Sequence, residues 1–189
     1  KNLYKENIRL NYLYNGKNRT HFAGKNKIVN AISTDFYERY LFTRSKDSLL
    51  NYLKEMNIPL TIRLSRASGV ISFLIGQPSE QNLNPHIWIG QDDFAIRKIR
   101  TPSSAEIVFE QMTSLPNEVF IAKSQTVSWP STSGGPMTTV KIKIKKIDMN
   151  APGSLQSFYP QNVEFSSEMN FSNKTDLTAV IEEFYSRFR

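Results

Sequence analysis

The chain has no cysteine among its 189 residues. Disulfide bonds, thiolate nucleophiles and cysteine-ligated zinc are therefore excluded. The absence of cysteine does not fix the compartment, because bacterial periplasmic and cytoplasmic proteins both often lack this residue.

Histidine is nearly as scarce, and motifs for catalysis are missing. The two histidines, His21 and His86, stand alone in their segments, so the paired spacing of a zinc site does not occur, and we expect both at the surface. Nucleophile elbows and phosphate-binding loops are also absent from the sequence. Asp92 and Asp93 could form a catalytic or metal-binding pair, but they lie in a predicted turn, where Asp commonly caps the backbone. We therefore expect neither an enzyme nor a cofactor.

Long hydrophobic runs are missing as well. No apolar stretch approaches the roughly 20 residues that cross a bilayer as a helix. The chain begins at Lys1 without Met or an apolar leader, so we expect a mature or trimmed product.

Basic residues, by contrast, are in excess. The 24 Lys and Arg against 17 Asp and Glu give a formal charge of +7. Such a charge raises the chance of an anionic partner, such as nucleic acid or a phospholipid surface, although it also suits an ordinary solvated surface. Hydrophobic residues make up 39% and aromatic residues 12%, which is enough to fill one core and line a pocket. We expect a single domain spanning residues 1–189.

Alternation of apolar and polar residues predicts a series of strands. The stretch "IWIGQDDFAIRKI", residues 87–99, has apolar residues at every second position on both sides of a polar break, which is typical of a hairpin. The same period indicates an antiparallel meander from residue 61 onward. Expected strands cover residues 8–14, 20–23, 61–64, 70–75, 87–89, 95–99, 106–111, 118–122 and 139–147.

Two segments favour helices. Residues 47–56 carry Leu49, Leu50 and Leu53 as a stripe after a cap at Ser45 or Asp47, and residues 175–188 repeat apolar residues at helical spacing. Residues 28–42 suit either a helix or two short strands. The sequence thus predicts an α+β fold: a curved antiparallel sheet with two or three helices.

The strand expected at residues 139–147 carries a basic stripe. Lys141, Lys143 and Lys145 alternate with Val and Ile, and Lys146 follows. One interpretation is a nucleic-acid-binding face, but a binder of single strands would interleave aromatic side chains with the lysines, and here Val and Ile stand between them. The other is a solvated face or an edge strand that lysines protect from unwanted pairing.

The segment from Leu64 to Gly76, followed by a polar loop and the hairpin "IWIGQDDFAIRKI", resembles the bacterial outer-membrane lipoprotein carrier superfamily, which includes LolA-like and LolB-like proteins. In that group a strand ending near Gly leads to a Trp-containing strand, a turn and a strand of basic and apolar residues. The resemblance extends over about residues 64–122. It implies an open β half-barrel whose apolar concave side is covered by helices and holds acyl chains of a lipid or lipoprotein in the periplasm.

This resemblance gives the apolar residues a second role besides ordinary core packing. Strand parity places one set on the inner face of the sheet: Leu10, Tyr12, Ile71, Phe73, Ile87, Ile89, Phe109 and Ile142. Four helix residues, Leu49, Leu53, Phe184 and Phe188, would cover the opening. Trp129 and Met137, on either side of a Gly/Pro/Ser loop, could form an exposed apolar tip.

We therefore expect a noncatalytic periplasmic carrier in outer-membrane lipoprotein transport, with or without an N-terminal lipid anchor preceding Lys1. Its basic exterior would favour an anionic membrane surface or another envelope protein. Two alternatives stay open: a nucleic-acid-binding module that uses the basic stripe, and a ligand-free structural domain of a cell-envelope complex.

Overall fold

The computed structural model describes residues 12–14, 18–23, 26–42, 45–77, 84–115, 119–130, 136–146 and 176–188. The chain divides into two compact units. One comprises Lys1–Ser33 and Asp148–Ile181, and the other comprises Thr34–Ile147 and Glu182–Arg189.

The first unit contains a small antiparallel sheet in the order β1-β2-β3. Its strands are β1 (Tyr12–Tyr14), β2 (Asn18–Ala23) and β3 (Asn26–Ala31). Of the strand predicted at residues 8–14, the structure describes the last three residues. The segment from residue 28 to residue 42, for which helix and strand were both open, is divided between β3 and the helix α1 (Glu38–Phe42).

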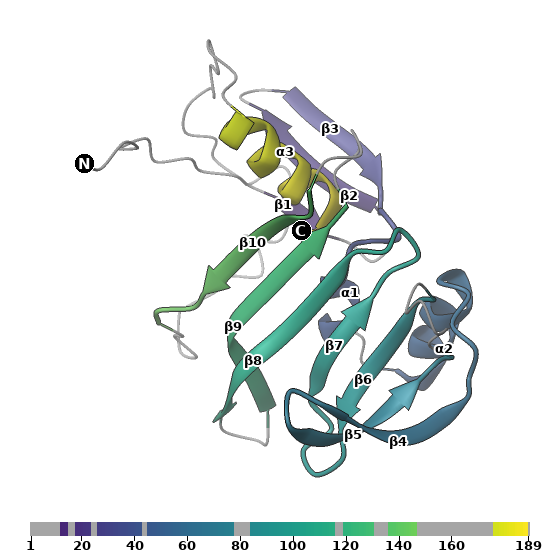
Figure 1. The fold of residues 1–189 in the computed structure, drawn as a ribbon. Coiled ribbons are helices and arrows are strands. Elements are labelled where there is room, and N and C mark those ends of the chain that lie inside the picture. The colour runs from purple at the N-terminus through teal and green to yellow at the C-terminus, as the bar shows by residue number, and fades with distance from the viewer. Residues whose placement is uncertain are drawn as a thin grey trace. The chain divides into compact units, whose positions relative to one another are not determined.

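The second unit is built on a seven-stranded antiparallel sheet (Figure 1), in which each strand pairs with its neighbour in sequence. The two outer strands, β4 and β10, do not pair with each other, so the sheet is not closed into a barrel. This confirms the predicted α+β class and the antiparallel meander. The strands are β4 (Ile62–Ala67), β5 (Val70–Ile75), β6 (His86–Gly90), β7 (Ile96–Arg100), β8 (Glu106–Leu115), β9 (Val119–Trp129) and β10 (Thr138–Lys143).

The register of this sheet aligns one β-branched aliphatic residue from every strand. Directly paired positions share a face of an antiparallel sheet, so these side chains form one continuous row. The aliphatic row consists of Ile62, Ile75, Ile87, Ile99, Ile107, Val127 and Val140. Its centre is the core of the unit, because Ile99, Ile107 and Val127 are fully buried, whereas Ile62 at the β4 edge is 62% exposed.

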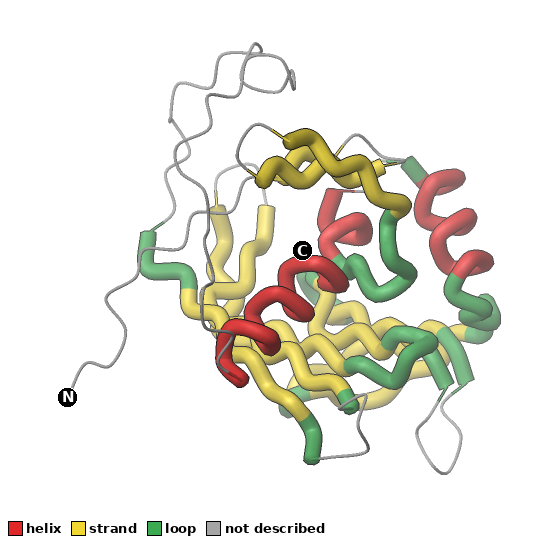
Figure 2. Tube along the Cα trace, turned by 90° about the horizontal axis from the view of Figure 1, so that it is seen from above, coloured by secondary structure: helices red, strands yellow, loops and turns green. Residues whose placement is uncertain are grey.

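Helix α1, helix α2 (Lys46–Glu55) and the C-terminal part of helix α3 (Asp176–Phe188) lie on the side of this sheet that carries the aliphatic row (Figure 2). Helices α1 and α2 share a cavity lining with this face, and Phe188 of α3 packs on Trp129. Helix α2 lies one residue earlier than the predicted range 47–56, and Ser45, one of the two predicted caps, is its N-cap: the Ser45 hydroxyl accepts a hydrogen bond from the Ser48 amide. Within the described parts of the chain, no helix combines the length and apolar character needed to cross a bilayer.

Helices α1 and α2 are joined through Arg39. Its guanidinium group is nearly buried, pairs with Glu55 at 2.8 Å and lies over the ring of Tyr52 at 4.7 Å from the centroid. The Tyr40 hydroxyl donates to the sulfur of Met56, at the end of α2. A buried cation is stable only when such partners compensate for lost hydration, so Arg39 fixes α1 against α2.

The C-terminal part of α3 packs on the other end of the same face. Phe184 and Phe188 contact the ring of Trp129, and all three are buried. Arg187 pairs with the buried carboxylate of Asp35, which also accepts a hydrogen bond of 2.6 Å from Ser103. The expectation that Trp129 forms an exposed tip is therefore wrong. The aromatic side chains of α3 cover Trp129, whereas Met137 is 54% exposed.

We expect the aliphatic row to contribute to stability in proportion to its burial. Truncation of Ile107 to Ala should lower the free energy of unfolding by about 2–5 kcal/mol, because a filled core position becomes a cavity. The matched control, Ile62→Ala, should change it by less than about 0.5 kcal/mol, because this side chain is already exposed. Urea unfolding monitored by circular dichroism measures both values. Equal losses in the two variants would contradict the assignment of the core.

Candidate functional site

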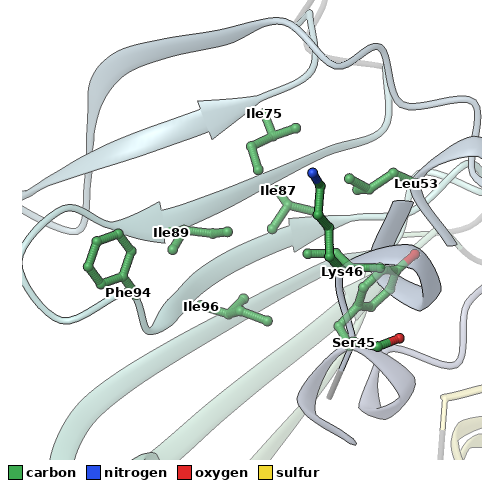
Figure 3. Close-up of a pocket in the computed structure, with 10 residues that line it drawn as sticks. Ser45, Lys46, Leu53, Ile75, Ile87, Ile89, Phe94 and Ile96 are labelled. Atoms are coloured by element: carbon green, nitrogen blue, oxygen red, sulfur yellow. The ribbon is translucent and has the colours of Figure 1, made fainter. Parts of the chain in front are cut away.

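A cavity of about 360 Å³ lies between α2 and the sheet (Figure 3). Its floor comes from β5, β6 and β7, and its other wall comes from α1 and α2. Eight of its ten lining residues are aliphatic or aromatic. The lining consists of Tyr40, Ser45, Lys46, Leu49, Leu53, Ile75, Ile87, Ile89, Phe94 and Ile96.

A β-bulge gives the cavity one of its floor residues. Between β6 and β7 the register shifts, so that Trp88 pairs with Lys98 but Ile89 pairs with Ile96. Simple alternation would place Ile96 and Ile99 on opposite faces, because they are three residues apart. The extra residue, Arg97, cancels one alternation and brings Ile96 into the cavity lining.

The turn between β6 and β7 holds Phe94 in an unusual backbone conformation. Its φ of 51° lies in the left-handed region, which is rare for an aromatic residue. The side chain is 73% exposed, yet it lines the cavity and stacks on Phe73 with 6.3 Å between ring centroids. Backbone strain combined with an exposed aromatic ring is characteristic of functional positions.

The turn itself depends on Asp93 and Gly90. One carboxylate oxygen of Asp93 accepts a hydrogen bond of 3.0 Å from the Ala95 amide, and the other pairs with Arg97. A Cβ atom at Gly90 would clash with the Asp93 carboxylate, so any larger residue there would displace the Asp93 side chain from this arrangement. The interpretation of Asp93 as a turn residue is confirmed, and Asp92 beside it is exposed. In the described residues no group of three potential metal ligands occurs.

Polar groups at the cavity come from the start of α2 and from α1. Lys46 is the charged member of the lining, and Ser45 is engaged in capping α2. Tyr40 contributes a neutral ring: burial raises the pKa of its hydroxyl to about 12, although nearby Arg39 opposes the shift. The cavity is thus apolar with a single cation.

The sheet register places all the strand residues of this unit that were predicted to line a binding site on one face of the sheet. Ile71, Phe73, Ile87, Ile89, Phe109 and Ile142 all project from the face that carries the aliphatic row. Four predicted residues meet in the cavity itself. These are Ile87 and Ile89 from β6 and Leu49 and Leu53 from α2.

The other predicted residues lie elsewhere. Phe184 and Phe188 pack on Trp129, and Phe109 contacts the ring of Tyr37 at 5.8 Å. Ile71 is 43% exposed near the β4–β5 turn, Phe73 supports Phe94, and Ile142 lies on the edge strand β10. Tyr12 belongs to β1 in the first unit, and Leu10 lies outside the described residues.

Sequence reasoning missed six lining residues. Ile75 was within reach, because it occurs in a predicted strand with strong alternation, whereas Ile96 lines the cavity only because of the bulge. The positions of Tyr40, Ser45, Lys46 and Phe94 depend on how α1, α2 and a turn pack, and local periodicity carries no information about such contacts.

The basic stripe lies at a sheet edge. Lys141 and Lys143 are exposed on β10 and project from the face opposite the cavity, next to Thr126 and Ser124 of β9. Lysines at this position suit edge protection. Their use by a nucleic acid stays a prediction.

No protein-family model, curated protein or solved structure matches this chain. The resemblance to lipoprotein carriers therefore rests on the residues that suggested it.

His86 is not at the surface, contrary to expectation. Its side chain is 1% exposed, on the face of β6 opposite Ile87, and its Nδ1 atom is 2.8 Å from the carbonyl oxygen of Asn84. Burial lowers the pKa of the imidazole, and the positive charges of Lys98 and Arg100 act in the same direction. The ring is therefore neutral in the folded protein near neutral pH.

We expect the stability to fall as the pH drops below 6.5, the ordinary pKa of this side chain. In that range the unfolded chain takes up a proton on His86 that the folded chain resists, so protonation favours unfolding. The loss should level off below the lowered pKa of the folded state. Urea unfolding at about pH 7.5 and about pH 5.5 measures the effect, and His86→Phe should reduce the difference between the two values. An unchanged difference in this variant would assign the pH dependence to other groups.

Proposed function

We propose that this protein is a noncatalytic carrier that binds an acyl chain of a lipid or lipoprotein in the cavity between α2 and the sheet. The observation that carries the proposal is the cavity: its volume of about 360 Å³ and its eight apolar lining residues suit a narrow hydrocarbon ligand. Small-molecule sites have volumes of about 300–1,000 Å³ and are mostly apolar with few polar groups.

The driving force would be the hydrophobic effect. Each methylene group transferred from water into an apolar site contributes about 0.8 kcal/mol. Part of this gain is lost because the ligand gives up translational and internal freedom on binding. Affinity should therefore increase with chain length until the cavity is filled.

Exposed apolar residues support access from the β4 edge. Ile62 and Leu64 project from the same sheet face as the cavity floor, are each at least 60% exposed, and pair with Ile75 and Phe73 of β5. With Phe94 they extend the apolar lining toward solvent. We infer that a hydrocarbon chain enters along this side.

The proposed function also requires a particular curvature of the seven-stranded sheet. We propose that the open sheet is a strongly curved half-barrel with its concave side under the helices, as in the carriers that residues 64–122 resemble. Contacts of α2 and α3 with the face of the aliphatic row support this arrangement. The corresponding cellular role is outer-membrane lipoprotein transport in the periplasm, with an anionic membrane surface or another envelope protein as partner.

Blocking the cavity should abolish ligand uptake. In Ile89→Asp a carboxylate would have to be buried beside the ligand, and in Ile89→Trp the larger side chain would fill the space. Titration with a fluorescent fatty acid, together with native mass spectrometry of the purified protein, measures binding. Each variant should lower affinity at least tenfold, about 1.4 kcal/mol.

The matched control for this test is Val140→Asp, which adds the same carboxylate to the same sheet face at the opposite edge, outside the cavity. It should leave the affinity at equilibrium unchanged. Circular dichroism checks that all variants fold. Undiminished uptake by a folded Ile89→Asp or Ile89→Trp variant would remove the cavity as the binding site.

A further inference from the structure

The cavity has one charged group, and its position indicates which ligands the site selects. Lys46 is the first residue of α2, is exposed, and lines the cavity together with apolar residues. In Figure 3 its side chain extends from α2 across the cavity side of the sheet, toward Ile75. The ammonium group is therefore a solvent-accessible charge beside an apolar lining.

Lys46 differs from Arg39 and Lys98, two other cations of this unit, in having no ion-pair partner among the described residues. Arg39 pairs with Glu55, and Lys98 pairs with Glu106 at 2.7 Å. Across the described residues Lys46 makes no ion pair. The neighbouring Asp47 is exposed and is not part of the lining.

The hydrogen bonds of Ser45 fix the backbone from which the exposed Lys46 side chain extends. The hydroxyl of Ser45 accepts from the Ser48 amide at 3.2 Å and is 2.8 Å from the Ser48 hydroxyl, which fixes the start of α2. Leu53 is 2% exposed and anchors the helix on the sheet. A bound ligand would therefore meet a cation beside an apolar floor.

We infer that the cavity selects single-chain amphiphiles with an anionic head, a carboxylate or a phosphate, over those with a neutral or cationic head. The inference rests on the proposed function, because it concerns the same cavity. The hydrocarbon chain binds the apolar lining, and the head lies beside the Lys46 ammonium. Attraction between opposite charges is stronger at the rim of an apolar cavity than in bulk water, because the local dielectric constant is lower.

The test compares heads on one chain. Palmitate, lysophosphatidic acid with the same acyl chain, hexadecanol and hexadecylamine are titrated into the wild-type protein and Lys46→Gln in one buffer at about pH 8. Palmitate and lysophosphatidic acid distinguish a carboxylate from a phosphate as the preferred head. In Lys46→Gln the affinity for the preferred anion should fall about two- to fivefold, which is typical of an exposed ion pair. The affinity for hexadecanol should not change.

Two further variants test whether the effect depends on the position and the sign of the charge. Lys143→Gln removes the same charge from β10, on the face opposite the cavity, and should leave every affinity unchanged. Lys46→Glu should reverse the preference, so that hexadecylamine binds more tightly than palmitate. Raising the salt concentration from ~0.05 M to ~0.5 M should weaken binding of the anions and not of hexadecanol.

The outcomes separate this inference from the proposed function. Equal weakening of palmitate and hexadecanol in Lys46→Gln would overturn the inference, because it would show that only the aliphatic stem of Lys46 contacts the ligand. Equal affinity of the wild-type protein for anionic and cationic heads would overturn it too. If neither palmitate nor hexadecanol binds, the proposed function itself fails.

Discussion

The register of the seven-stranded sheet is the constraint on which the rest of this structure depends. It aligns one Ile or Val from each strand into the aliphatic row, from Ile62 at one edge to Val140 at the other. A slip of one residue in any strand would turn that strand's apolar side chains to the opposite face. The core beneath α3 and the floor of the cavity would then both be lost, because they are parts of the same face.

The same apolar face serves two purposes because the helices above it carry different side chains. On α3, Phe184 and Phe188 are large and fill the space over Trp129, so this end is solid core. On α2, Leu49 and Leu53 are smaller, so a cavity remains. Core and site are therefore distinguished by side-chain volume on the helices, whereas the strands beneath are alike in character.

Much of the fold could be predicted from the sequence. The boundaries of β5, the hairpin of β6 and β7, the start of α2 and the turn role of Asp93 all follow from local patterns. Local patterns failed where a neighbour distant in sequence decides. His86 was expected at the surface but is buried in the sheet. Trp129 precedes a Gly/Pro/Ser-rich segment and was expected to be exposed, but the aromatic side chains of α3 cover it.

By itself, the sequence determined where most of the strands lie and which apolar residues of a regular strand share a face, because a period of two residues is a local property. Tertiary structure alone decided which part of that face is filled and which is hollow. The bulge that brings Ile96 into the cavity, the strained turn at Phe94 and the position of Lys46 depend on packing between segments far apart in the chain. Side-chain volume in three dimensions, which periodicity does not encode, sets the difference between core and cavity.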